Sequence, residues 1–272
     1  MHQKAAFTVG LILILMVACT PAHNNLNSTL WMQSSSEYQA LTQTIYKAAS
    51  DHLDKALADT RGTAALEQKA PFENLPPAVI LDIDETVLDN SLYQGQLIAD
   101  KETFNADNWD DWIAHAQASP VQGAAGFIRE AQQRGVAVIF ITNRTCRARS
   151  EPGSPCPQEQ DTLNNLKSAG ILAETFPDEM LLRYEMADWS SEKQSRRLHV
   201  AASYRIVMLF GDDLGDFIPN VKTGIDPDER LRLASQHQEK WGTQWFMLPN
   251  PTYGSWLSIL PEPHHKLVKD WR

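Results

Sequence analysis

Two groups of acidic side chains are the residues in this sequence whose types and spacing best suit them to bind a metal or to take part in catalysis. Asp82 and Asp84 directly follow one run of apolar residues, and Asp212, Asp213 and Asp216 follow another. If the two runs are neighbouring strands, their carboxylates meet at one site and raise one another's pKa values unless a cation neutralises them. Oxygen-rich sites of this kind select a hard cation, and Mg²⁺ is the usual ion beside a phosphate group. The spacing therefore predicts a metal site that handles phosphate.

A second set of polar residues offers groups that can hold a phosphate. Thr142 and Asn143 follow the apolar run 136–141, where a hydroxyl group and backbone N–H groups can donate hydrogen bonds to phosphate oxygens. Lys193, in the charged stretch 190–197, can add a positive charge. Each residue also has an ordinary interpretation, because Thr142 can simply end a strand and Lys193 can be a solvated lysine on a helix surface.

Alternating strands and helices must position these residues. Short apolar runs typical of buried strands occur at 78–83, 136–141, 180–182, 206–210 and 245–248. Helical patterns occur at 36–58, 126–134, 158–169, 190–202 and 226–240. This order predicts an α/β fold, a Rossmann-like parallel sheet with helices on both faces. Ligands bind beyond the carboxyl ends of such strands, which is where the acidic residues and Thr142 stand.

Composition restricts the class of protein. The 272 residues are enough for one large domain or two small ones, and 43% of them are apolar and 21% charged. These fractions exclude a disordered chain, a collagen-like repeat and a polytopic membrane protein. The formal net charge of −10 opposes binding to nucleic-acid phosphates, so no nucleic-acid partner is expected. A small phosphorylated substrate must therefore be held by a local cation or metal.

The N-terminus has the features of an export signal. Lys4 precedes the uncharged stretch 5–17, which is too short for an ordinary transmembrane helix but suits a signal-peptide core. The residues Met16-Val17-Ala18-Cys19 resemble a bacterial lipobox, which implies a lipoprotein signal peptide over 1–18 and lipidation of Cys19. A plain secretory signal with a chance cysteine is the alternative.

The mature chain is expected to have two parts. The polar, aperiodic residues 19–33 predict a tether, and residues 34–272 predict a single domain with helical cap segments at about 34–75 and 88–118. Thr20, and not Asp, follows the cysteine of the lipobox. By resemblance to Gram-negative lipoproteins, this favours the outer membrane, with the lipid anchor as the only membrane contact. A monomer and a homodimer are both compatible with the sequence.

Two further cysteines, Cys146 and Cys156, lie in a loop rich in Pro, Gly and Ser. In an exported protein two such cysteines are expected to pair, and closing so short a loop stabilises a fold by about 2–3 kcal/mol in the chain-entropy model. A metal site is the alternative, but no Cys-x-x-Cys motif or neighbouring histidine supports it.

The polar motifs occur in the order typical of one enzyme superfamily. The sequence resembles the phosphatase branch of the haloacid dehalogenase superfamily at Asp82-x-Asp84-x-Thr86, Thr142, Lys193 and Gly211-Asp212-Asp213-x-x-Asp216. The stretches Asp82–Asn90 and Leu248–Trp256 are similar to those of bacterial class C acid phosphatases, the outer-membrane lipoprotein e family. This resemblance runs from about Tyr38 to Trp256.

The resemblance implies catalytic and metal-binding roles. Asp82 would attack phosphorus to form an aspartyl-phosphate. Asp84 would protonate the leaving alcohol and later deprotonate the water that cleaves the intermediate. The Asp82 carboxylate, the Asp84 backbone carbonyl and Asp212 would bind Mg²⁺, which neutralises the charge between nucleophile and phosphate.

The resemblance also implies roles for the residues around the reacting groups. Thr142 and the Asn143 amide would bind phosphate oxygens, and Lys193 would add a positive charge. Asp213 and Asp216 would support the metal site from a second layer or orient Lys193.

Specificity must come from residues outside the sheet. Aromatic rings stack on nucleobases, which makes candidates of Trp109, Trp112, Tyr253 and Trp256, although each could simply pack in the core. Tyr253 is the first choice, because 250–254 reads as a turn after the final strand, and Trp109 is the second.

The expected activity is Mg²⁺-dependent hydrolysis of phosphomonoesters by an acid phosphatase, with 5′-nucleotides as candidate substrates. One alternative is a phosphotransferase or phosphomutase with the same nucleophile, but export separates such an enzyme from cytoplasmic phosphorylated intermediates. The other is a non-catalytic surface lipoprotein on this scaffold, against which the intact Asp82, Asp84 and Asp212 argue.

Overall fold

The structure is a computed structural model that describes residues 24–150, 153–172 and 179–271. The predicted signal peptide, Cys19 and the first part of the predicted tether lie outside the described residues. None of the helices in the described ranges is both long enough and apolar enough to cross a membrane.

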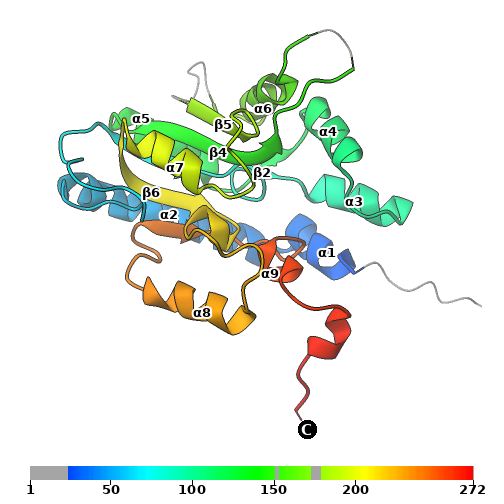
Figure 1. The fold of residues 1–272 in the computed structure, drawn as a ribbon. Coiled ribbons are helices and arrows are strands. Elements are labelled where there is room, and N and C mark those ends of the chain that lie inside the picture. The colour runs from blue at the N-terminus through cyan, green and yellow to red at the C-terminus, as the bar shows by residue number, and fades with distance from the viewer. Residues whose placement is uncertain (1–23, 151–152, 173–178, 272) are drawn as a thin grey trace, which may run out of the picture.

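In the described part of the chain, five parallel strands form the central sheet (Figure 1). In spatial order they are β5 (Glu179–Arg183), β4 (Ala137–Thr145), β1 (Pro77–Leu81), β6 (Arg205–Gly211) and β7 (Trp245–Met247). Leu81 lies beside Phe140 of β4 and Phe210 of β6, so the residues after these positions leave the sheet at one edge. The predicted α/β fold with a parallel sheet is confirmed.

Helices cover both faces of the sheet (Figure 1). One face is covered by α2 (Ser36–Ala58), α5 (Ala124–Gln133) and α6 (Pro157–Ser168), and the other by α7 (Gln194–Ala201) and α8 (Pro227–Gln236). Successive residues of β1 point to opposite faces, so Val79 and Leu81 belong to one hydrophobic core and Ala78 and Ile80 to the other. Burial on both faces explains why the strands are continuously apolar.

A helical insertion interrupts the chain shortly after β1. Its two ends pair as short antiparallel strands, β2 (Leu88–Asp89) and β3 (Ser119–Pro120). Between them lie α3 (Ser91–Asp100) and α4 (Ala106–His115), to one side of the sheet in Figure 1. The segment predicted as a cap at 88–118 corresponds to this insertion, and α4 packs against α6.

Two expectations about the N-terminal part are wrong. Residues 26–33 are not a tether, because they form helix α1 (Leu26–Ser34), which packs against α3 and buries Thr29 and Met32. The helix within 34–75 is not a cap segment either. Its apolar residues, among them Tyr46 and Leu53, belong to the core between α2, α5 and the sheet. Helical spacing had predicted a buried stripe, but such a stripe does not identify the surface it covers.

Element boundaries differ by a few residues from the sequence pattern. β4 continues to Thr145, past the predicted end, because its pairing with β5 shifts register after Thr142 and resumes where Thr145 meets Arg183. The helix predicted from 190 begins only at Gln194. The remaining short elements are the 3₁₀ turns η1 (Leu214–Asp216) and η2 (His264–Leu267), and helix α9 (Ser255–Ser258).

A buried ion pair attaches the connection before β1 to the acidic end of β6. Nη2 of Arg197 on α7 lies 2.5 Å from Oε1 of Glu67, and both side chains are at most 3% exposed. Nη1 of Arg197 donates hydrogen bonds to the carbonyl oxygens of Gly215 and Asp216, at 3.1 and 2.8 Å. The pair therefore holds the turn η1, which carries Asp216, in place.

We expect Glu67→Ala to lower the free energy of unfolding by about 3 kcal/mol, because Arg197 then stays buried without its counter-charge. Urea denaturation followed by circular dichroism measures this loss. Glu229→Ala is the matched control, since its partner Arg232 is 53% exposed and the loss should stay below about 1 kcal/mol. Equal losses in the two variants would contradict the assigned role of the buried pair.

Candidate active site

The centre of the site is the pair of Asp82 and Lys193. Asp82 is the first residue after β1, and its N–H donates to the carbonyl oxygen of Phe210 at 3.0 Å, which fixes it between β1 and β6. Lys193 stands immediately before α7, with its side chain only 3% exposed. Its Nζ lies 2.7 Å from Oδ1 of Asp82 and 2.6 Å from Oδ1 of Asp216. The interpretation of Lys193 as a solvated surface residue is wrong.

Carboxylates from two strand ends gather around this pair. Asp82, Asp212 and Asp216 each place an oxygen within 4.8 Å of the others. Burial raises the pKa of Asp82 to about 6 against the lowering effect of Lys193, and the charges of Asp216 and Asp84 add to the rise. Burial, followed by repulsion from Asp82 and Asp216, also holds the pKa of Asp212 well above its usual range.

These donors fit a hard divalent cation. Both oxygens of Asp216 have partners, because Oδ1 pairs with Lys193 and Oδ2 accepts the N–H of Asp213 at 3.0 Å. Asp212 is oriented by Asn250, whose Nδ2 donates to its Oδ2 at 2.8 Å. Asp82 and Asp212 therefore remain as the two carboxylates best placed to bind an ion, and their mutual repulsion is the charge that an ion would neutralise.

Asp84 lies beside the acidic cluster, in a network of its own. The guanidinium group of Arg144 is fully buried, and its Nη2 lies 2.8 Å from Oδ1 of Asp84. Asn90 donates to the same oxygen at 3.0 Å. Arg144 is itself held by α6, because its Nη1 donates a hydrogen bond to Oγ1 of Thr162 at 3.0 Å. Asp84 is thus held at the mouth of the site, with its side chain 15% exposed.

The end of β4 presents Thr142 and Asn143 to the same edge of the sheet. Thr142 is fully buried, and its Oγ1 accepts the N–H of Arg144 at 3.1 Å. The side chain of Asn143 faces α7 and the residues just before it. Its Oδ1 accepts a hydrogen bond from Arg196 at 2.7 Å, and its Nδ2 donates one to the Ser191 carbonyl at 3.1 Å. The Asn143 side chain is thereby engaged in the fold, which leaves its backbone as the group that a phosphate could contact.

Asp213 points away from the cluster. Its carboxylate caps the turn η1 at the N–H of Gly215, 2.8 Å away, and accepts from the N–H and hydroxyl of Ser255 at 2.6 and 2.8 Å. Although burial alone would raise it, the pKa of Asp213 is lowered by Lys222 and by these hydrogen bonds. Asp213 therefore connects the turn to α9.

Two of the candidate aromatic residues contact neighbours of Asp84. The hydroxyl of Tyr253 donates to Oε2 of Glu85, the neighbour of Asp84. The ring of Trp109 on α4 lies 5.9 Å from the guanidinium carbon of Arg144, which pairs with Asp84. Both side chains are partly exposed.

The other two aromatic candidates are less well placed. Trp112 packs on the core and donates from Nε1 to Asn90 at 2.8 Å. Trp256 is 37% exposed and donates from its indole to the carbonyl oxygen of Tyr253 at 3.0 Å.

Several residues of the site were not identified from the sequence. Arg144 and Asn90 bind Asp84, and Glu85 is buried, with its pKa raised by burial and by the charges of Asp84 and Asp212. Asn90 and Glu85 belong to the motif that begins at Asp82, and Arg144 follows Thr142 and Asn143 directly. Their position next to recognised motif residues was the available signal. Sequence position alone, however, does not show which polar side chains point into the site.

Comparison with known proteins identifies the family. The family model of the haloacid dehalogenase superfamily, subfamily IIIB (acid phosphatase), matches residues 14–256. A structure of the class C acid phosphatase from Bacillus anthracis is 31% identical over 85% of this chain and 86% of that chain, with a TM-score of 0.69. A structure of class C acid phosphatase from Bacillus anthracis with tungstate bound is 28% identical over 91% of this chain and 98% of that chain, with a TM-score of 0.75.

The order of the motifs, the parallel sheet that gathers them at one edge and the match over most of the length agree. The chain therefore belongs to the acid phosphatases of the haloacid dehalogenase superfamily, subfamily IIIB.

Proposed function

We propose that this acid phosphatase is a Mg²⁺-dependent phosphomonoesterase that forms an aspartyl-phosphate on Asp82 and prefers 5′-nucleotides. The observation that carries the mechanism is the position of Asp82, at the end of the central strand and 2.7 Å from a buried lysine. A lysine in this position holds the nucleophile in one orientation and supplies a positive charge to an incoming phosphate.

The chemistry follows from the positions of the two aspartates. A carboxylate oxygen of Asp82 attacks phosphorus, and the bond from phosphorus to the ester oxygen breaks. Asp84 gives its proton to the departing alkoxide, then takes a proton from the water that attacks the aspartyl-phosphate. This second step restores Asp82 and releases inorganic phosphate. The partners of Asp84, Arg144 and Asn90, keep its carboxylate at the mouth of the site through both steps.

Asp82, Asp212 and the backbone carbonyl of Asp84 are the groups that would hold Mg²⁺. The ion would supply positive charge between the nucleophile and the phosphate, which otherwise repel each other. Thr142, the Asn143 backbone and Lys193 would contact the phosphate oxygens. Tungstate is a tetrahedral oxyanion like phosphate, so its presence in the Bacillus anthracis structure supports an oxyanion site in that relative.

The preference for nucleotides is supported by the two aromatic side chains near Asp84. Because Asp84 protonates the leaving group, rings beside it are placed to contact that part of the substrate. Tyr253 and Trp109 stand next to the two residues that flank Asp84, Glu85 and Arg144. The lipobox-like stretch before Cys19 supports export and attachment to the outer membrane by a lipid.

The function is tested by phosphate release from a panel of monoesters, with and without EDTA. We expect hydrolysis that EDTA abolishes and added Mg²⁺ restores, because the buried carboxylates repel phosphate without a cation. Asp82→Asn should show no turnover while retaining the far-ultraviolet circular dichroism of the wild type. Full activity in EDTA, or in Asp82→Asn, would refute the metal requirement or the nucleophile respectively.

For Asp84→Asn we expect a loss that depends on the leaving group. An ester with a poor leaving group needs a proton from Asp84, whereas an activated ester such as p-nitrophenyl phosphate does not. The loss in kcat/KM should therefore be about tenfold or more greater for glycerol phosphate than for p-nitrophenyl phosphate. Equal losses on the two esters would show that Asp84 is not the general acid.

For Tyr253→Ala we expect kcat/KM for a 5′-nucleotide to fall roughly tenfold to a hundredfold, since one stacking contact contributes about 1–3 kcal/mol. Hydrolysis of glycerol phosphate should hardly change. Tyr253→Phe is the matched control, because it keeps the ring and removes only the hydrogen bond to Glu85. If the two variants lose activity equally, the hydroxyl and not the ring is what matters.

A further inference from the structure

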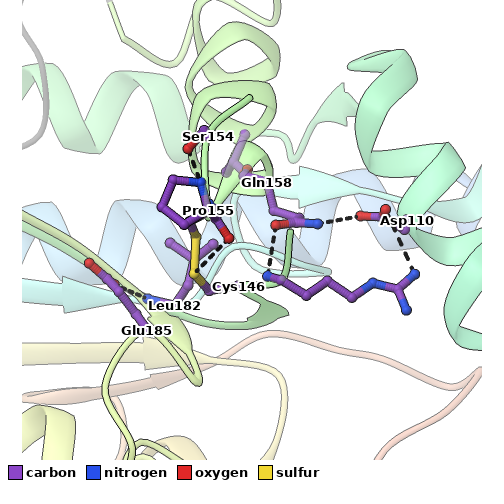
Figure 2. Close-up of a disulfide and its surroundings, with 10 residues drawn as sticks. Asp110, Cys146, Ser154, Pro155, Gln158, Leu182 and Glu185 are labelled. Atoms are coloured by element: carbon purple, nitrogen blue, oxygen red, sulfur yellow. Dashed lines mark hydrogen bonds and ion pairs between the residues drawn. A yellow bond between two sulfur atoms is a disulfide. The ribbon is translucent and has the colours of Figure 1, made fainter. Parts of the chain in front are cut away.

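The loop closed by the disulfide Cys146–Cys156 lies between the catalytic sheet and the helical insertion. Cys146 directly follows β4, and its N–H donates to the carbonyl oxygen of Arg183 at 2.8 Å. Cys156 directly precedes α6, and the two Cα atoms are 4.7 Å apart (Figure 2). We call residues 146–150 and 153–156 the latch loop. Both of its ends are thus fixed to elements of the core.

Two arginines of the latch loop reach helix α4. Nε and Nη2 of Arg149 donate to the carboxylate of Asp110 at 2.8 and 3.1 Å, and its Nη1 binds Asp161 on α6 at 2.7 Å. Nη2 of Arg147 donates to Asp107 and to the carbonyl oxygen of Ala106, at 2.9 and 3.0 Å. The first half of α4 is therefore bound to the latch loop by ion pairs and hydrogen bonds.

A buried glutamine completes this connection, as Figure 2 shows. Oε1 of Gln158 accepts the N–H of Arg147 at 3.1 Å, and its Nε2 donates to Asp110 at 2.8 Å. Gln158 is fully buried and Asp110 is 8% exposed. Burial alone would raise the pKa of Asp110, but the hydrogen bonds from Arg149 and Gln158 outweigh it and lower the pKa. The charged form of the Asp110 carboxylate is thus stabilised by its contacts with Arg149 and Gln158.

Asp110, which the latch loop and Gln158 hold in place, directly follows Trp109 in α4. Trp109 contacts Tyr93 edge to face, with ring centroids 4.9 Å apart, and faces the Arg144 guanidinium at 5.9 Å. Arg144 pairs with Asp84, so the position of α4 sets the distance between an aromatic ring and the general acid. None of the latch-loop contacts described above involves a residue that would touch phosphate.

We propose that the latch loop determines substrate specificity by fixing Trp109 beside the leaving group, and that the Cys146–Cys156 disulfide keeps the loop in its binding conformation. An open loop of this length has many more conformations, so Arg147 and Arg149 would lose their preorganised positions. The residues that would contact the phosphate, Asp82, Thr142 and Lys193, lie outside both the latch loop and α4. The substrate class in this proposal, nucleotides, rests on the proposed function, whereas the attachment of α4 to the loop does not.

Three variants of the full mature domain separate these contributions. Cys146→Ser with Cys156→Ser opens the latch loop, and Arg149→Gln removes its main contacts with Asp110. Arg134→Gln is the matched control. Arg134 is exposed to a similar extent as Arg149 and also forms two ion pairs, with Asp54 and Glu130, but these join α2 and the end of α5 and do not involve α4. Each protein is assayed with AMP and with glycerol phosphate, and hydrogen exchange is measured for the amides of α4.

We expect the cysteine pair variant and Arg149→Gln to exchange faster in α4 and to lose about tenfold to a hundredfold in kcat/KM for AMP, the range for one stacking contact. The loss should appear chiefly in KM. Hydrolysis of glycerol phosphate should stay within about twofold of the wild type, and Arg134→Gln should resemble the wild type throughout.

Unchanged exchange in α4 would overturn the latch. Faster exchange with equal losses on both substrates would show that the loop supports the fold and not specificity, which also overturns the proposal. A wild-type enzyme without preference for AMP would instead refute the proposed preference for nucleotides, and the exchange of α4 would still decide whether the loop holds the helix.

Discussion

The need to bury several carboxylates close together constrains the rest of this structure. Asp82 follows β1 while Asp212 and Asp216 follow β6, and their oxygens lie within 4.8 Å of one another. In a chain with a net charge of −10, such a cluster requires buried positive charge. The sheet brings the acids together through its register, and the segment at the start of α7 supplies the compensating cations.

That segment carries three buried cationic residues, each with a separate task. Lys193 pairs with Asp82 and Asp216, Arg196 donates to the Thr142 carbonyl at 2.5 Å, and Arg197 binds Glu67 and the turn η1. One short helix therefore aligns the ends of β1, β4 and β6. Burial lowers the pKa of Arg196 to about 10, which still leaves it charged in the acid and neutral range. One short segment is thus bound to each strand end that contributes to the candidate site.

Much of this could be predicted from the sequence, because the signals were local. A continuous apolar run followed by Asp82 and Asp84 indicates a buried strand and its polar end. Three motifs of this kind, with Lys193 in a charged stretch between the second and the third, indicate the superfamily by their order. Arg144 could not be assigned, because its partner Asp84 is sixty positions away and only the fold brings them together. Helix α1 was missed for a similar reason, since it buries Thr29 and Met32 only by packing on α3.

The short ladder of β2 and β3 has a consequence for how such an enzyme can change over evolution. Leu88 pairs with Pro120, so the chain enters and leaves the helical insertion at neighbouring points. An insertion with adjacent ends can be lengthened, shortened or exchanged with little effect on loop closure in the rest of the domain. Asp82 and Asp84 lie outside this exchangeable module, whereas Trp109 lies within it. Under the roles proposed above, preference for the leaving group can therefore diverge between related enzymes as long as Asn90, which binds Asp84 from within the insertion, is retained.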